Sequence, residues 1–181
     1  MTEALEQGTK TISGYRDVSD ELKAGNLEFL TTGDAITQVT IKEELRTQKF
    51  GTFKYKFCGE QYDNLSGILN SYSEIYDIGE KCDIVVTEIL RTNPLLVNAE
   101  PSHDFKPGEK FKVAIGSQHK KGDFSFKLGS KLIGYIKKSD GKVYKSLGVG
   151  SKVLVELEIF VKRNGRGKGF LFTTPLKNLD E

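Results

Sequence analysis

The stretch GTFKYKF at residues 51–57 has an aromatic side chain at every second position, Phe53, Tyr55 and Phe57, and a lysine at each position between. Successive side chains of a β-strand point to opposite faces, so the three rings lie on one face and the lysines on the other. This pattern predicts a strand with one face in a protein core. The opposite face is predicted to form a cationic surface.

The stretch GDFSFKL at residues 122–128 repeats this pattern 71 positions later (122 minus 51). Neighbouring segments match as well: LSGIL at 65–69 resembles LIGYI at 132–136, 67 positions apart, and GEK at 79–81 resembles GSK at 150–152, again 71 positions apart. Differences of length confined to turns are what homologous copies tolerate. The sequence therefore predicts an internal duplication. The alternative is chance similarity between short strands bounded by glycine.

Each copy contains five short segments of alternating or β-branched residues, separated by turns rich in Gly, Asn and Ser. We therefore predict an all-β protein, built as two small five-stranded barrels in tandem and related by the internal repeat. The predicted domains are a partly disordered N-terminal arm at 1–33, a first, acidic barrel at 34–100, and a second, basic barrel with a short acidic tail at 101–181.

The N-terminal arm has no counterpart in the repeat. Residues 18–25 are typical of one short helical turn, with Ser19 or Asp20 as its cap and Gly25 at its end. Two alternatives remain open for this arm: it docks on the first barrel, or it becomes ordered with a partner.

The net charge of +2 conceals a strong asymmetry along the chain. Residues 1–100 carry 10 Lys and Arg against 17 Asp and Glu, whereas residues 101–168 carry 16 against 6. Such a basic half indicates a polyanionic partner, although a solvated lysine-rich surface is the plainer explanation. The acidic first half is a candidate surface for a protein partner.

Several other classes of protein are disfavoured by the sequence. The two cysteines, Cys58 and Cys82, are 24 positions apart and lack the spacing of a zinc site or a disulfide framework. No signal peptide or membrane-spanning run is recognisable, so we expect a cytoplasmic protein. His103 and His119 have no ligand or catalytic partner at a suitable spacing. We therefore expect neither an enzyme nor a bound metal or cofactor.

The predicted strand order, with the Gly-x-Phe-x-[Tyr/Phe]-Lys strand and the Gly-x-Lys that opens the fourth strand, resembles OB-fold nucleic-acid-binding proteins. These include the single-stranded DNA-binding proteins of phages and of replication machinery. The resemblance covers residues 34–177 and is one of fold. It implies an oligonucleotide site on the second and third strands and on the loops that join strands one to two and four to five. A role in DNA replication, recombination or repair would follow.

Cationic residues lie at these positions in both copies. Glycines at 165, 167 and 169 would let the backbone of the loop between the last two strands approach an anion closely. The predicted phosphate contacts in the second copy are Lys120, Lys121, Lys127, Lys137, Lys162, Arg163, Arg166 and Lys168. Those in the first copy are Arg46, Lys49, Lys54, Lys56 and Arg91.

Single-strand binding also needs flat surfaces on which bases stack. In the strand at 132–136, Leu132, Gly134 and Ile136 are predicted to point inward. Tyr135 therefore points outward and is the best stacking candidate. Tyr72 and Tyr76 either stack bases or cover a barrel end. The sequence thus predicts a non-catalytic protein that binds single-stranded DNA or RNA. The alternative is a protein-interaction or structural accessory module, of a phage or mobile element, that does not bind nucleic acid.

Overall fold

The computed structural model describes residues 11–25, 30–47, 49, 51–62, 65–130, 132–161 and 169–181, and the backbone of Lys162. The chain divides into two compact units. The first consists of Met1–Leu45, Lys54–Asn70 and Asp77–Asp104, and the second of Arg46–Phe53, Ser71–Tyr76 and Phe105–Glu181.

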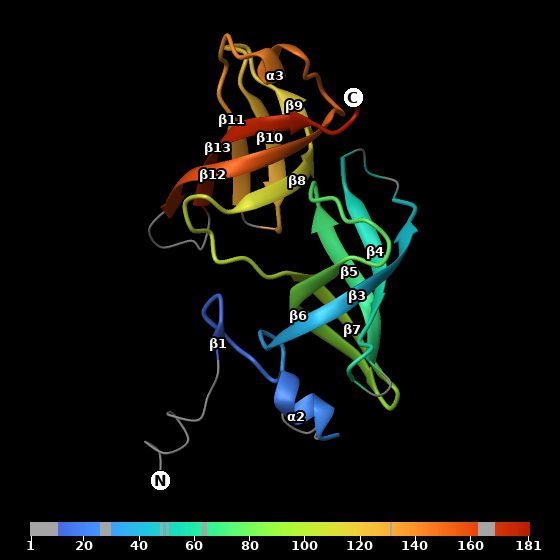
Figure 1. The fold of residues 1–181 in the computed structure, drawn as a ribbon. Helices are drawn as coiled ribbons and strands as arrows, with labels where there is room; N and C mark the ends of the chain where they lie inside the picture. The colour runs from blue at the N-terminus through green and yellow to red at the C-terminus, as the bar shows by residue number, and fades with distance from the viewer. Residues whose placement is uncertain are drawn as a thin grey trace. The chain divides into compact units, whose positions relative to one another are not determined.

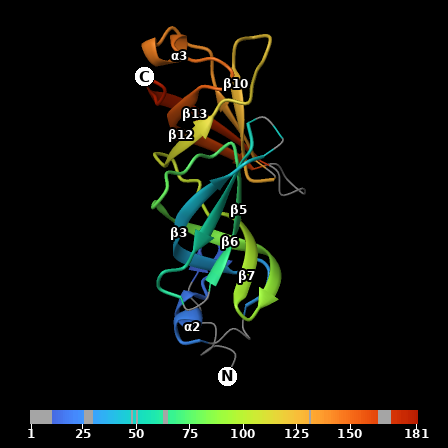
Figure 2. The same cartoon turned by 90° about the vertical axis from the view of Figure 1, so that its right-hand side faces the viewer.

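The first unit contains a closed barrel with the strand order β3-β4-β5-β7-β6. Its strands are β3 (Ala35–Leu45), β4 (Phe53–Cys58), β5 (Leu65–Tyr72), β6 (Lys81–Thr92) and β7 (Leu95–Pro101) (Figures 1 and 2). β5 and β7 run parallel, whereas β3–β4, β3–β6 and β6–β7 are antiparallel pairs. Tyr55 and Phe57 are buried in the barrel, as the alternating pattern predicts. Phe53, at the start of β4, is only half-buried.

The second unit contains a six-stranded sheet with the order β8-β12-β13-β11-β10-β9. Its elements are β8 (Lys110–Ala114), β9 (Ser117–Gln118), β10 (Phe124–Leu128), β11 (Leu132–Ile136), the one-turn helix α3 (Lys142–Lys145), β12 (Lys152–Lys162) and β13 (Gly169–Asn178). β11 and β13 are parallel neighbours, like β5 and β7 in the first unit. Buried side chains from five strands, including Phe124 and Phe126, form one core. The prediction of an all-β protein is confirmed.

The two units share a pattern of hydrogen bonds between their first and fourth strands. Ile41 donates its N–H to the Glu80 carbonyl (2.9 Å) and accepts from the Gly79 N–H (2.8 Å). Ile115 donates to Ser151 (2.9 Å) and accepts from Gly150 (2.8 Å) in the same way. Gly79 and Gly150 are therefore equivalent, 71 positions apart as the sequence comparison predicts.

The second strands, however, match at a different spacing. Gly134 lies opposite Phe126 in the β10–β11 ladder, and a Cβ at Gly67 would lie 2.6 Å from the Phe57 ring. Phe57 is thus equivalent to Phe126, 69 positions apart, and the predicted spacing of 71 is wrong here. A shift of two residues keeps every side chain on its own face, so the period-two pattern cannot detect it.

The segment Ser71–Tyr76 contributes a short stretch of strand to the second unit, although its first two residues are the end of β5. Ala114 donates its N–H to Ser73 O (2.9 Å), and Ile75 donates to Lys112 O (2.8 Å). Ser73 donates to Lys127 O (3.0 Å), while its Oγ accepts from the Lys127 N–H (2.8 Å). The segment therefore pairs with both β8 and β10.

The described part of the N-terminal arm docks on the first unit. It contains β1 (Thr11–Ile12), β2 (Tyr15–Arg16) and α2 (Ser19–Lys23). Val18 donates its N–H to Ala35 O (3.0 Å) and, like Leu22, is buried. The cap prediction is wrong: the N-cap residue is Val18, and Asp17 accepts from the Ser19 N–H instead (2.9 Å).

An ion pair also holds the arm. Arg16 Nε donates to Asp34 Oδ1 (3.0 Å) and its second nitrogen donates to Oδ2 (2.6 Å), while the Asp34 side chain is 5% exposed. The hydrogen bond to Asp34 raises the pKa of Arg16 above its ordinary value. A bidentate pair of this kind is geometrically specific, so it fixes the position of the arm at the start of β3.

The equivalent glycines of the third strands provide a test of packing. A Cβ at Gly67 would lie 2.2 Å from the carbonyl oxygen of Val97, a backbone atom that cannot rotate away. Gly67→Ala is therefore expected to lower the free energy of unfolding by about 1 to 3 kcal/mol or more. Chemical denaturation measures this effect. Gly148→Ala is the control, because nothing lies within 4 Å of its Cβ position. Equal stability of the two variants would contradict the packing described here.

Candidate nucleic-acid interface

The outer face of the second sheet carries a group of aromatic side chains on the parallel strands β11 and β13. Gly134 and Ile136 of β11 are buried, and Tyr135 between them points outward, as predicted. Leu171 and Thr173 of β13 are buried in the same way, so Phe170 and Phe172 point outward. Because Tyr135 lies directly opposite Phe172 in the ladder, residues far apart in sequence meet on one face.

These rings contact one another and His119. The Tyr135 centroid lies 5.9 Å from that of Phe172, with an angle of 25° between the planes, and 6.0 Å from that of Phe170. His119, from the turn between β9 and β10, lies 5.7 Å from Tyr135. We call Tyr135, Phe170, Phe172 and His119 the aromatic face. The rings of the three sheet residues, Tyr135, Phe170 and Phe172, are only half-buried. Part of each ring surface is therefore open to solvent.

An apolar surface continues from the aromatic face onto β12. Ile159 lies opposite Phe172 and Val161 opposite Phe170 in the β12–β13 ladder. Their side chains are 57% and 43% exposed, which is unusual for neighbouring β-branched residues in a sheet. The paired residues thus form two rows across β12, β13 and β11. One row is Ile159, Phe172 and Tyr135, and the other is Val161, Phe170 and Ile133.

Lysines border the aromatic face. Lys137 Nζ lies 4.8 Å from the centroid of Phe172. Lys127 is exposed and lies opposite Ile133 in the β10–β11 ladder, two positions from Tyr135. Lys120 and Lys121 are exposed in the turn that also carries His119. The structure therefore brings five predicted site residues close to the same face: Lys120, Lys121, Lys127, Tyr135 and Lys137.

The basic loop between β12 and β13 lies outside the described residues. The structure therefore does not describe three of the predicted contacts, Arg163, Arg166 and Lys168. Of Lys162 it describes the backbone but not the side chain. The strands on either side of the loop are described, and the register places Lys162 opposite Gly169. The loop therefore leads directly into Gly169, the first residue of β13. Phe170 and Phe172 follow in the same strand.

The predicted contacts of the first copy are not brought together in one place. Lys54 and Lys56 are exposed on β4, where Lys56 lies 3.5 Å from a carboxylate oxygen of Glu43. Arg91 donates its Nε–H to Pro94 O (3.2 Å) in the turn between β6 and β7. Arg46 and Lys49 are exposed on a segment that belongs to the second unit.

In the described part of the first unit, the positions equivalent to Tyr135 and Phe172 carry no aromatic side chain. Ile68 lies opposite Asn98 in the parallel β5–β7 pair, where the second unit has Tyr135 and Phe172. Asn98 donates from Nδ2 to a Glu88 oxygen (3.0 Å). Neither an aliphatic nor an amide side chain offers the ring surface on which a base stacks, so the two units differ chemically at the same place in the sheet.

The other tyrosines have structural partners. Tyr62 is buried and donates its hydroxyl proton to Thr37 O (2.8 Å). Tyr76 donates its hydroxyl to the buried Glu74. The Tyr72 ring lies 5.7 Å from Lys127 Nζ. Sequence reasoning missed Phe170 and Phe172. The alternation in the sequence FLFTT predicts that these two rings share one face of a strand. It does not reveal that β11, with Tyr135, is the partner strand.

The described residues contain no cluster of His, Cys, Asp or Glu placed to hold a metal ion. Neither of the two described helices has the length and the apolar character needed to cross a lipid bilayer. The sequence matches no protein-family model, and no curated protein is significantly similar to it.

Proposed function

We propose that this protein binds single-stranded nucleic acid, without catalysis, through the aromatic face of its second unit. The observation that carries the proposal is the group formed by Tyr135, Phe170 and Phe172 on the outside of the sheet, with Lys127 and Lys137 close by. Half-exposed rings offer stacking surfaces to bases, each worth about 1 to 3 kcal/mol, and the lysines offer contacts to phosphates. Bases in a duplex are already stacked, so the face suits unpaired strands.

We further propose that both units are OB-like barrels related by duplication. The matching strand orders, the parallel pairs β5–β7 and β11–β13, and the equivalent hydrogen bonds of Ile41 and Ile115 support this assignment. In OB-fold proteins oligonucleotides bind on strands two and three, which here are β10 and β11. A role in DNA replication, recombination or repair is part of this proposal.

Titration of fluorescently labelled oligonucleotides with the full chain, at several salt concentrations, tests the proposal. Single-stranded DNA or RNA is expected to bind more tightly than a duplex of the same length. The logarithm of the affinity should fall linearly with the logarithm of salt concentration, by about 0.7 per phosphate contact. Contacts from four lysines would give a slope of about −2.8. Absence of single-strand binding at low salt would refute the proposal.

That negative result would favour the alternative, a protein-interaction module. One observation is compatible with it: the exposed side chains of Ile159 and Val161 extend the aromatic face as an apolar surface. Such a surface also suits a protein partner. The flanking lysines favour a polyanion, which is why nucleic acid is our first proposal.

A further inference from the structure

Lysines gather at the end of the second unit that carries α3, beyond the edge of the aromatic face. Three segments meet there: the turn 119–123, the turn 137–141 and α3 itself. Tyr144 of α3 donates its hydroxyl to Gly122 O, and the Lys138 N–H donates to Asp123 Oδ1 (2.7 Å). These bonds fix the three segments to one another.

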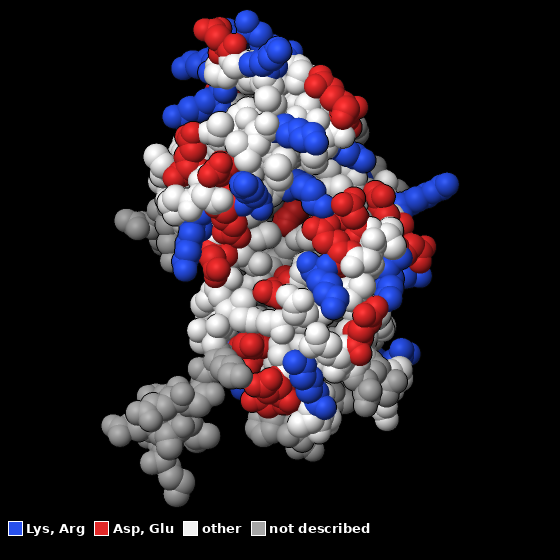
Figure 3. Space-filling model, viewed as in Figure 1, with Lys and Arg blue, Asp and Glu red and all other residues white. Residues whose placement is uncertain are grey.

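The packing of α3 determines which of its side chains are exposed. The Tyr144 ring lies 5.3 Å from that of Phe124, and Tyr144 and Leu147 pack against the core. Lys142 and Lys145 lie three positions apart, so they share one side of the helical turn, and both are exposed. Figure 3 shows Lys and Arg side chains gathered around this end of the unit.

The resulting surface is strongly positive. Its six lysines are accompanied by two acidic residues, Asp123 and Asp140, in the same segments. All six lysines are exposed: Lys120, Lys121, Lys137, Lys138, Lys142 and Lys145. We call this group the α3 lysine surface. Lys137 belongs both to it and to the border of the aromatic face, so the two surfaces are continuous.

The duplication shows that this charge is not a general property of the fold. The connection between β5 and β6, residues 73–80, has the sequence SEIYDIGE, with three acids and no lysine, and its first part, Ser73–Tyr76, belongs to the second unit. The corresponding connection of the second unit, residues 137–151, has four lysines and one acid. The positive charge therefore accompanies the aromatic face, in the same unit.

We propose that a bound single strand continues past the aromatic face and over the α3 lysine surface, where Lys138, Lys142 and Lys145 contact phosphates of nucleotides whose bases do not stack on the protein. This inference rests on the proposed function and extends its site. It predicts a site with two parts: stacking on the sheet, which a short oligonucleotide satisfies, and phosphate contacts at α3, which only a longer one reaches.

The test uses Lys142→Ala with Lys145→Ala in the full chain, and single strands of about 4 and about 16 nucleotides, the limits of the usual range for one OB barrel. Loss of two phosphate contacts is expected to flatten the salt slope for the long strand by about 1.4. Affinity for the short strand should not change. Thermal unfolding of the variant should match that of the parent, because both side chains are exposed.

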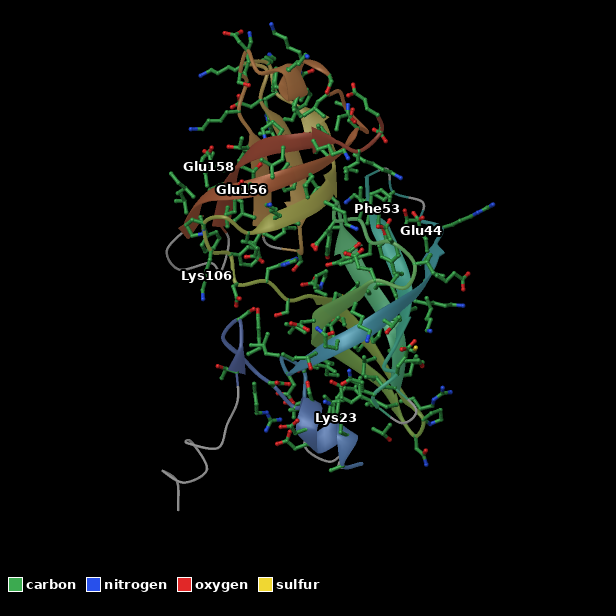
Figure 4. The ribbon with its side chains drawn as sticks, viewed as in Figure 1. Lys23, Glu44, Phe53, Lys106, Glu156 and Glu158 are labelled. Atoms are coloured by element: carbon green, nitrogen blue, oxygen red, sulfur yellow. The ribbon has the colours of Figure 1, made fainter. Side chains whose placement is uncertain are left out.

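The matched control is Lys106→Ala with Lys110→Ala, which removes the same charge from another part of the second unit. Both lysines are exposed, and Lys110 lies opposite Glu156 in the β8–β12 ladder. Figure 4 labels Glu156 and Glu158 on β12, so carboxylates accompany the lysines in this part of the unit. The control should bind the long strand with the parental salt slope.

The outcomes separate this inference from the proposed function. If the parent binds both strands and the α3 variant keeps the parental slope for the long strand, the inference is wrong and the proposed function stands. The inference is also wrong if the α3 variant and the control lose the same amount, since the effect is then one of net charge. If the parent binds neither strand, both proposals fall.

Discussion

Replacing Tyr135 and Phe172 together by Ala is expected to weaken the binding of single-stranded DNA or RNA at least about tenfold. Each stacked base contributes about 1 to 3 kcal/mol, and 1.4 kcal/mol corresponds to a factor of ten. The two rings are stacked on each other, 5.9 Å apart, so their single effects are not expected to add. The salt slope should stay nearly unchanged, because neither side chain contacts a phosphate. Fluorescence titration at several salt concentrations measures both quantities.

The first unit provides the control for this experiment. Ile68 and Asn98 occupy the equivalent positions of the first unit and lie opposite each other in the same parallel arrangement. Replacing both by Ala should leave the affinity at its parental value, provided that denaturation shows both variants to be folded. If the Tyr135 and Phe172 variant binds as tightly as the control, bases do not stack on the aromatic face.

Residues 105–181 expressed alone are expected not to fold cooperatively. The sequence predicts that the second barrel, from about residue 101 to 178, is separable, but the structure closes it with Ser71–Tyr76. Four hydrogen bonds join Ser73 and Ile75 of this segment to β8 and β10. At about 0.5 to 1.5 kcal/mol each, their loss costs about 2 to 6 kcal/mol. A fragment of this size has a total stability of only about 4 to 12 kcal/mol.

Removing the segment also removes the bridge partner of a core residue. Val113 of β8 is fully buried and pairs with Glu74 in the complete chain. Circular dichroism during heating should therefore show no sharp transition for the fragment. A fusion in which a flexible Gly/Ser linker joins Ser71–Tyr76 to Phe105 should restore one. A sharp transition in the fragment without the segment would mean that β8 and β10 need no third strand between them.

The strands and their buried faces could be predicted from local pattern. Alternation along β4 and β10 identified five core residues: Phe53, Tyr55, Phe57, Phe124 and Phe126. All are buried except Phe53, which is half-buried at the start of β4. Each of these predictions depends only on neighbours within one strand, because backbone geometry fixes the period of two. The outward position of Tyr135 follows from the same rule.

The sequence by itself thus determined an all-β chain, the faces of its strands and the basic character of its second half. The tertiary structure alone decided which strands are neighbours. The parallel pairing of β11 with β13 places Phe170 and Phe172 beside Tyr135, and hydrogen bonds place Ser73 between β8 and β10. Both depend on pairing between distant residues. A period of two reveals the face of a side chain, whereas the partner strand and its register are set by packing in three dimensions.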